Sequence, residues 1–208
     1  MSISILCHGD SITRGYYDHG WKHHPYSRKL GELLKDHFHS SITFNITTQG
    51  INGETTASML KRLEKTFSET KTKYDCLVVL GGLNDLGDET PDLIAQNLCD
   101  MVVLGRKNVK NSCVLISVPN CYPDRSYSKY REAKDAVNKR LKEYVDKQNG
   151  SLTPRVHFLD LTEHGLDFFA MDDKQRSLIY DDNIHYTPEG YDLLGSAVFN
   201  VLKSDISV

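Results

Sequence analysis

Short apolar runs rich in β-branched residues alternate with longer amphipathic segments along this chain of 208 residues. The runs are ISILC (3–7), ITFNIT (42–47), CLVVLG (76–81), CVLISV (113–118) and VHFLDL (156–161). Such runs are typical of strands in a parallel sheet, and the longer segments between them are long enough for crossover helices. The pattern therefore predicts an α/β fold of the doubly wound type, with helices on both faces of one sheet in a three-layer α/β/α sandwich.

The amphipathic segments are predicted to form the covering helices. They span Pro25 to about His39, Thr55 to about Phe67, Pro91 to about Leu104, Tyr127 to about Lys147 and Pro188 to the C-terminus. Pro25, Pro91 and Pro188 each suit the first turn of a helix, where a missing N–H costs nothing. The sequence shows no internal repeat, linker or low-complexity tract, so residues 1–208 are expected to form a single domain.

Composition and charge narrow the class of protein. Hydrophobic residues make up 39% of the chain and charged residues 25%, as in folded globular proteins. The formal net charge is −3 and the Lys and Arg residues are dispersed, so nucleic acid is not expected as a partner. No apolar run approaches the roughly 20 residues of a transmembrane helix, and the N-terminus lacks the features of a signal peptide. We therefore expect no transmembrane segment and a cytoplasmic location; the sequence gives no signal of oligomeric state.

The cysteines are five in number and widely spaced. They are Cys7, Cys76, Cys99, Cys113 and Cys121. Because the sequence has no C-x-x-C pair and no Cys/His cluster at zinc spacing, neither disulfides nor a metal site is expected. Cys7, Cys76 and Cys113 lie in apolar runs and are expected to be buried. Cys121 falls in a predicted loop and is a candidate for an exposed thiol.

The first strand is followed by HGDSITRG, at the end of the sheet where parallel-sheet proteins collect their ligands. Gly9 permits a sharp turn, and Ser11 would then stand at the start of a helix, where unpaired N–H groups favour negative charge. That position suits a nucleophile with half an oxyanion hole beside it. On this stretch alone, a plain helix cap formed by Ser11 or Asp10 is the more common role for such residues.

Three further segments carry polar groups of the same kind. In TTQGINGETT, Gly53 could offer its N–H to an anion, although Asn-Gly is also a common turn. In LGGLND, the amide of Asn84 could face a developing oxyanion or bond its own backbone in a turn. In IYDDNIHYTPEGY, Asp182 precedes His185 by three residues. An Asp that accepts from imidazole Nδ1–H lets the other ring nitrogen take a proton from a nucleophile, although the same pair could simply cap a helix.

Together, GDSIT, GINGET, GLND and DNIH resemble the first, second, third and fifth sequence blocks of the SGNH hydrolases, also called the GDSL-like esterase family. SVPNCYP would correspond to the looser fourth block, and the resemblance runs from residue 5 to about residue 195. It implies a flavodoxin-like fold with five parallel strands in the order 2-1-3-4-5. It also implies a hydrolase that needs no metal and no organic cofactor.

The resemblance assigns roles position by position. Ser11 is the implied nucleophile, His185 the general base and Asp182 the residue that orients it. The implied oxyanion hole consists of the backbone N–H groups of Ser11 and Gly53 and the side chain of Asn84.

Two residues near these blocks, Asp181 and His8, could also serve the site, and the sequence around Ser11 bears on the fold. Asp181 could orient the base on chemical grounds alone, and only the family spacing selects Asp182. His8 lies beside the first block and is interpreted as a structural or pocket-wall residue. Ser11 does not sit in the G-x-S-x-G elbow of the larger α/β-hydrolases, which argues against that fold.

The predicted activity is hydrolysis of a small-molecule carboxylic ester with a small or medium acyl chain. A carbohydrate O-deacetylase, a lysophospholipase and a thioesterase are alternatives on the same site, and a non-catalytic binding module is the alternative from another class. The candidate pocket walls are Tyr16, Tyr17, Trp21, Leu86, residues 120–130 and residues 167–173. Within the last segment, Phe168, Phe169 and Met171 suit either an acyl pocket or the core.

Overall fold

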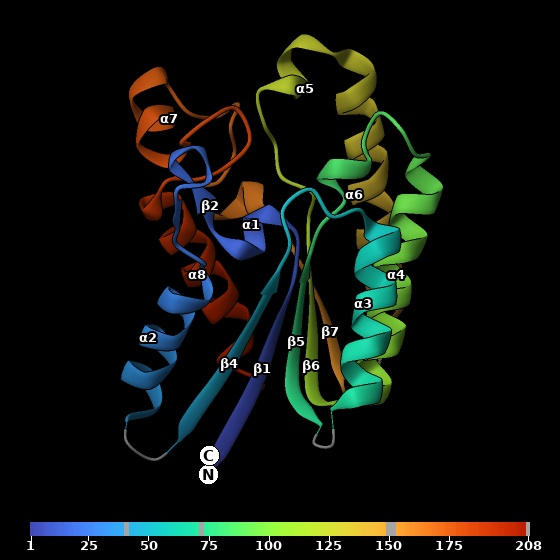
Figure 1. Cartoon of the computed structure of the whole chain (residues 1–208), viewed down its shortest axis with the longest axis vertical. Coiled ribbons are helices and arrows are strands. Elements are labelled where there is room, and N and C mark those ends of the chain that lie inside the picture. The colour runs from blue at the N-terminus through green and yellow to red at the C-terminus, as the bar shows by residue number, and fades with distance from the viewer. Residues whose placement is uncertain (40–41, 71–72, 149–152, 207–208) are drawn as a thin grey trace.

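A parallel sheet of five strands forms the centre of the computed structural model, which describes residues 1–39, 42–70, 73–148 and 153–206. The strands are β1 (Ser2–Gly9), β4 (Thr43–Gly50), β5 (Tyr74–Leu80), β6 (Val109–Ile116) and β7 (Arg155–Leu159). Their spatial order is β4-β1-β5-β6-β7, and every neighbouring pair is parallel (Figure 1). Counted along the chain this is 2-1-3-4-5, so the predicted order is confirmed.

Helices cover both faces of the sheet and complete the predicted three layers (Figure 1). One face carries α2 (Ser27–Phe38) and α8 (Pro188–Leu202), and the other carries α3 (Thr56–Glu69), α4 (Pro91–Asn108) and α6 (Ser128–Gln148). Pro91 and Pro188 lie in the first turns of their helices, as predicted.

Three predicted helix ends were wrong. The helix predicted to end near Leu104, α4, continues to Asn108. Pro25 precedes the N-cap residue of α2 and lies outside the helix, because the cap is Tyr26. The last helix stops at Leu202 instead of reaching the C-terminus, and residues 203–205 form a turn. Residues 207–208, which that prediction included, lie outside the described residues.

Short elements surround the carboxyl ends of the strands, and of these only the helix that begins at Ser11 was expected from the sequence. They are α1 (Ser11–Arg14), β2 (Tyr16–Tyr17), η1 (Asp18–Gly20), β3 (Lys22–His23), η3 (Leu83–Asp85), α5 (Pro123–Ser126), η4 (Leu161–His164) and α7 (Asp173–Ile179). In Figure 1, α5 and α7 lie at the upper end of the molecule and α1 and β2 just above the strand ends, whereas the N-terminus lies at the lower end. The candidate site is therefore built from short elements set on a rigid sheet.

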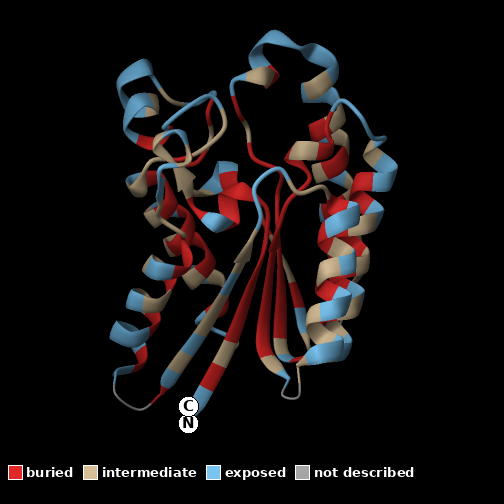
Figure 2. Ribbon diagram, viewed as in Figure 1, coloured by how far each residue is buried: buried red, intermediate tan, exposed pale blue. Residues whose placement is uncertain are grey.

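The central strands are buried almost throughout, and the helices turn buried faces toward them (Figure 2). Cys7, Cys76 and Cys113 belong to this core, as predicted. The expectation of an exposed thiol at Cys121 was wrong, because its exposed fraction is 0%. The loop after β6 turns inward there, and the Cys121 N–H donates to the Asp124 carboxylate at 2.8 Å. Burial raises the pKa of the Cys121 thiol to about 12.

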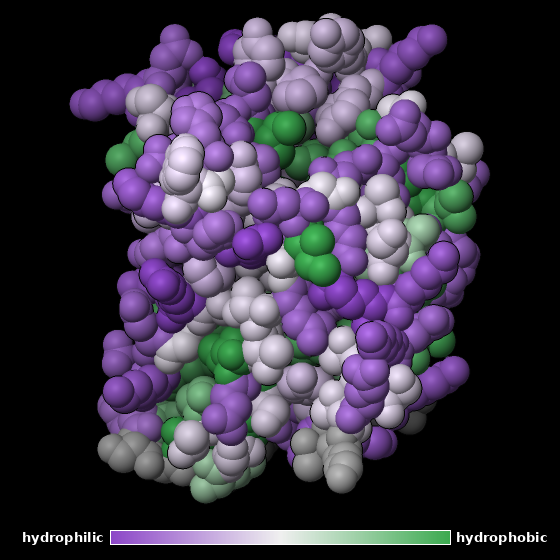
Figure 3. Space-filling model, viewed as in Figure 1, coloured by the Kyte–Doolittle hydropathy of each residue, from purple (hydrophilic) through white to green (hydrophobic). Residues whose placement is uncertain are grey.

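The outer surface shown in Figure 3 is largely hydrophilic, with hydrophobic residues in small separate groups. Within the part of the chain that the structure describes, no helix is both long enough and apolar enough to cross a membrane.

The sheet register brings three site-bearing loops to one level. Gly9 at the end of β1 pairs with Gly50 of β4 on one side and with Leu80 of β5 on the other. A Cβ atom at Gly9 would lie 2.3 Å from the Leu80 carbonyl oxygen, and one at Gly50 would lie 2.2 Å from the Arg14 nitrogen. Both positions therefore require glycine so that α1 can pack across the strand ends.

Candidate active site

In the turn after β1, different residues fill the two roles that the sequence left open, the helix cap and the candidate nucleophile. Asp10 is the N-cap of α1, and its Oδ1 accepts the Ile12 N–H at 2.9 Å. Ser11 is the first residue of the helix, so its own N–H belongs to the unpaired first turn. Because Asp10 does the capping, the Ser11 hydroxyl is available for another partner.

That partner is His185, which the fold brings from the far end of the sequence. Ser11 Oγ lies 2.8 Å from His185 Nε2, and His185 Nδ1 lies 2.8 Å from Asp182 Oδ2. With Nδ1 protonated and donating to the carboxylate, Nε2 accepts the Ser11 hydroxyl proton in a hydrogen bond. The structure thus brings together three of the predicted site residues in one hydrogen-bonded chain.

Asp182 is held in place by its own backbone turn. Its Oδ1 accepts the N–H groups of Ile184 at 2.7 Å and His185 at 2.6 Å. Partial burial alone would raise the pKa of Asp182, but the hydrogen bonds from the His185 ring and from these two N–H groups outweigh it and lower the pKa to about 2. The carboxylate is therefore ionised at neutral pH.

The neighbouring carboxylate, Asp181, has a different partner. Its Oδ2 accepts the N–H of Asp18, which belongs to the turn between β2 and β3. In the same hairpin, the Tyr16 ring centroid lies 4.4 Å from that of His185, and the Tyr191 hydroxyl donates to the Tyr16 carbonyl at 2.7 Å. Asp181 and Tyr191 therefore anchor a hairpin that packs an aromatic ring on the imidazole.

Gly53 lies in the loop after β4 and Asn84 in η3 after β5, the two strands that flank β1 in the sheet. Gly53 has a φ of +71°, a backbone conformation that side-chain-bearing residues rarely adopt, and a Cβ atom there would meet nothing within 4 Å. Glycine is therefore required at this position for backbone conformation rather than for space. Asn84 Nδ2 donates to the Glu54 carbonyl at 3.0 Å and lies 3.5 Å from Asp10 Oδ2.

Asp85, next to Asn84, is a site residue that sequence reasoning missed. It is buried, and its two carboxylate oxygens each accept the Thr56 N–H at 3.0 Å, while Oδ1 also accepts the Thr56 hydroxyl at 2.6 Å. Asp85 thereby ties η3 to the first turn of α3 and sets the loop of Gly53 beside Asn84. Its place after Asn84 in GLND was the available signal, but a partner in another loop cannot be read from one motif.

Asp10 is buried beneath the site, with an exposed fraction of 1%. Burial raises the pKa of its carboxyl group to about 7, although the Ile12 N–H and the charge of His185 partly oppose this. His8 is also fully buried and contacts the Met59 carbonyl through Nε2 at 2.9 Å, which fits a structural residue.

A cavity of about 350 Å³ adjoins Asp182. Residues from both predicted wall segments line it, namely Tyr122 and Arg125 from 120–130 and Phe168 and Asp173 from 167–173. Phe168 nevertheless has an exposed fraction of only 3% and is mainly a core residue, whereas Phe169 is 40% exposed.

Other predicted wall residues divide between surface and core. Trp21 is 85% exposed at the tip of the β2–β3 hairpin, and Leu86 is buried at 7%. Across the described ranges, no group of three or more His, Cys, Asp or Glu side chains is arranged to hold a metal ion.

The three-layer fold and the order of the site segments are typical of one class of hydrolase, and comparison with known sequences identifies the family. The sequence model of the GDSL-like Lipase/Acylhydrolase family matches residues 7–193. The chain therefore belongs to this family and is an esterase- or lipase-type hydrolase. No curated protein sequence matches the chain significantly.

Solved structures share the fold over nearly the whole chain. A lipase/acylhydrolase from Enterococcus faecalis superposes with a TM-score of 0.75 at 22% identity, covering 99% of this chain and 100% of that one. The M. smegmatis aryl esterase has a TM-score of 0.69 at 17% identity and covers 98% and 100%. A carbohydrate acetylesterase from Sinorhizobium meliloti has a TM-score of 0.67 at 17% identity and covers 97% and 99%.

Proposed function

We propose that this hydrolase cleaves carboxylic esters with small or medium acyl chains, with Ser11 as nucleophile, His185 as general base and Asp182 as the residue that orients the base. The observation that carries the proposal is the hydrogen-bonded chain from Ser11 Oγ through the imidazole to Asp182, with 2.8 Å at each step. These contacts meet the geometric requirement for an activated nucleophile.

The reaction follows from that geometry. Ser11 Oγ attacks the ester carbonyl carbon while His185 Nε2 takes the hydroxyl proton, and Asp182 stabilises the imidazolium that forms. The imidazolium then gives its proton to the leaving alcohol, which departs and leaves an acyl ester on Ser11. A water molecule then attacks the acyl carbon while His185 takes one of its protons. The Ser11 oxygen leaves and takes that proton back, which releases a carboxylic acid and restores the free enzyme.

The oxyanion hole that we propose has three donors, the N–H groups of Ser11 and Gly53 and the Asn84 side chain. The free first turn of α1 supports the role of the Ser11 N–H, and the open space beside Gly53, where a Cβ atom would meet nothing within 4 Å, supports access to its backbone. Asn84 commits one N–H to the Glu54 carbonyl at 3.0 Å; the other lies 3.5 Å from Asp10 and is only weakly engaged, so it is free to donate to an oxyanion.

The cavity beside Asp182 is our candidate for part of the substrate pocket, although Ser11 and His185 are not among the residues that line it. Its volume of about 350 Å³ lies near the lower end of the range for ligand pockets. Tyr122, Arg125, Ser177 and Asn183 give it polar walls, an observation that favours carbohydrate O-deacetylation as the second candidate. A panel of aryl esters of increasing acyl length, run beside acetylated sugars, separates the two.

Ser11→Ala tests the central assignment. We expect its kcat on an aryl acetate to fall at least about 10⁴-fold, because the nucleophile is lost. A fluorophosphonate probe, read by mass spectrometry, should label Ser11 in the wild-type protein only. Ser27→Ala is the matched control, since Ser27 is also buried but bonds Thr48. An active Ser11→Ala variant would refute the assignment, and an unlabelled, inactive wild type would favour the binding module.

A further inference from the structure

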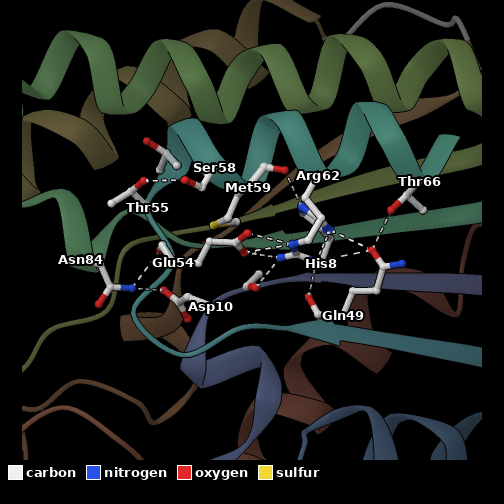
Figure 4. Close-up of polar contacts among 12 residues, drawn as sticks. His8, Asp10, Gln49, Glu54, Thr55, Ser58, Met59, Arg62, Thr66 and Asn84 are labelled. Atoms are coloured by element: carbon white, nitrogen blue, oxygen red, sulfur yellow. Dashed lines mark hydrogen bonds and ion pairs between the residues drawn. The ribbon is translucent and has the colours of Figure 1, made fainter. Parts of the chain in front are cut away.

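The guanidinium of Arg62, on α3, lies between that helix and the ends of β1 and β4 (Figure 4). Its Nε donates to the Glu54 carboxylate at 2.9 and 3.1 Å, and one of its NH2 groups forms an ion pair with the same carboxylate. The guanidinium also donates to the Gly9 carbonyl at 2.9 Å and to the Gln49 carbonyl at 3.2 Å. One side chain therefore joins the ends of β1 and β4 to the start of α3.

Glu54, the partner of Arg62, adjoins two of the proposed oxyanion donors. Glu54 follows Gly53 directly, and the Glu54 carbonyl accepts the Asn84 amide at 3.0 Å. When Arg62 holds the Glu54 side chain, it restrains the residue next to Gly53 and the carbonyl that accepts from Asn84. The Glu54 carboxylate is only 8% exposed, so this ion pair is shielded from competing water.

The Gly9 carbonyl connects Arg62 to the third donor. Gly9 lies two residues before Ser11, at the turn from β1 into α1. A hydrogen bond to its carbonyl restrains the orientation of the peptide that leads into the Asp10 cap. Arg62 thus contacts, through one rigid planar group, the backbone on both sides of the proposed oxyanion hole.

His8 is a further contact of the Arg62 guanidinium. Its Nε2 donates to the Met59 carbonyl at 2.9 Å, which leaves Nδ1 as an acceptor 3.2 Å from Arg62. The imidazole can accept there only while it is neutral. Burial, with a further contribution from the Arg62 charge, lowers the pKa of His8 to about 4, so the acceptor persists at neutral pH.

We propose that Arg62 is a positioning residue for ester hydrolysis, which holds the Ser11, Gly53 and Asn84 donors in register through Glu54 and the Gly9 carbonyl. This inference rests on the proposed function. It predicts that Arg62 acts on the transition state, in which the oxyanion develops, more than on substrate binding.

Arg62→Met removes the charge and the hydrogen bonds while keeping an unbranched side chain. We expect kcat on an aryl acetate to fall about 100-fold, because small displacements of catalytic groups have effects of that size, with KM changed less than about threefold. Arg62→Lys keeps the charge but cannot contact the carboxylate and two carbonyls at once, so it should recover only part of the rate. It also serves if the Met variant folds poorly.

Lys110→Met is the matched control. Lys110 pairs at 3.0 Å with Asp75, whose side chain is 7% exposed, at the opposite end of the sheet from the site. Both variants unpair a carboxylate of similar burial, so both should lower the midpoint of urea unfolding. Only Arg62→Met should lower kcat. Equal losses of kcat in the two variants would mean that Arg62 is merely structural.

A double-mutant cycle identifies the route by which Arg62 acts. If it positions the oxyanion donors, Arg62→Met should reduce kcat much less in an Asn84→Ala background than in the wild type. Strictly multiplicative losses would contradict this route.

Hydrogen exchange provides a readout without any substrate. In Arg62→Met the amides of residues 50–55 should exchange faster, while those of the β2–β3 hairpin, residues 16–23, should not change. Unchanged exchange at residues 50–55 in Arg62→Met would overturn the inference but not the proposed function. So would a kcat of Arg62→Met within twofold of wild type while Ser11→Ala is inactive. A wild-type protein that hydrolyses no ester would overturn the proposed function, and the exchange result would still decide whether Arg62 orders the loop.

Discussion

The two carboxylate oxygens of Asp182 have separate partners, and this division makes the residue hard to replace. Oδ1 accepts two backbone N–H groups, and Oδ2 accepts from His185 Nδ1 at 2.8 Å. An asparagine has only one oxygen. If that oxygen keeps the two backbone hydrogen bonds, the amide NH2 faces Nδ1 and forces the imidazole into the tautomer that cannot accept the Ser11 proton.

Asp182→Asn should therefore lower kcat by about 10⁴-fold while the protein remains folded. Asp181→Asn is the matched control, because the Asp181 carboxylate accepts the Asp18 N–H, whereas the His185 ring bonds Asp182. Its kcat should stay within about tenfold of wild type. Steady-state kinetics on one aryl acetate compares the two, and a larger loss in Asp181→Asn would reverse the assignment of the orienting carboxylate.

At the residue scale, the sequence revealed side chains that belong to motifs and missed those defined by distant partners. Ser11, Asp182 and His185 stand in short blocks with a chemical logic of their own, so they could be proposed before the fold was known. Asp85 acts through Thr56, at the start of α3, and Arg62 acts through Glu54, eight residues earlier in the chain. Their roles depend on the sheet register, which no local pattern encodes.

A buried lysine joins elements on the other side of the site. Lys134 of α6 has a side chain only 2% exposed; its Nζ lies 3.1 Å from the Asp124 carboxylate and donates to Asn120. Asn120 in turn donates to Asp167 at 2.9 Å, and Tyr180 donates to the Asn120 carbonyl at 3.1 Å. Lys134 thus links α6 to the loop after β6 and to the segment before α7.

Lys134→Met should lower the free energy of unfolding by about 3–5 kcal/mol, because it leaves the buried Asp124 carboxylate unpaired. Adding Asp124→Asn should restore part of this loss, since the amide oxygen can still accept the Cys121 N–H. Lys139→Met is the control on the same helix; its exposed pair with Glu143 should contribute less than about 1 kcal/mol. Urea unfolding measures all four proteins, and a Lys134→Met loss as small as the control's would contradict the argument.

At the element scale, length decided what could be predicted. The five long strands and their helices have enough residues for apolar runs and amphipathic faces to be recognised, and the structure confirms them. The hairpin β2–β3 has two residues in each strand and is held by Asp181 and Tyr191 from far along the chain. Such elements follow from tertiary contacts, so periodicity cannot reveal them.

Across the whole molecule, two buried titratable groups near the strand ends affect stability in opposite directions. Asp10 has its pKa raised from 3.8 to about 7, so the stability from its neutral form is complete below about pH 4 and is lost as the pH rises through 7. His8 has its pKa lowered from 6.5 to about 4, so the stability from its neutral form is complete above about pH 6.5 and is lost as the pH falls through 4. Between about pH 4 and 6.5 the two slopes oppose each other and largely cancel.

Asp10→Asn removes one of these slopes and exposes the other. The asparagine oxygen can still cap α1 but does not titrate, so the unfolding free energy of the variant minus that of wild type should increase with pH from 4 to 7 and then level off. A pKa change from 3.8 to about 7 in a fully buried group corresponds to a total increase of about 4 kcal/mol. Any fixed difference in cap strength shifts the curve without changing its slope. Urea unfolding at half-unit steps from pH 4 to 8 measures the difference, and a flat difference would show that Asp10 is ionised throughout this range in the folded protein.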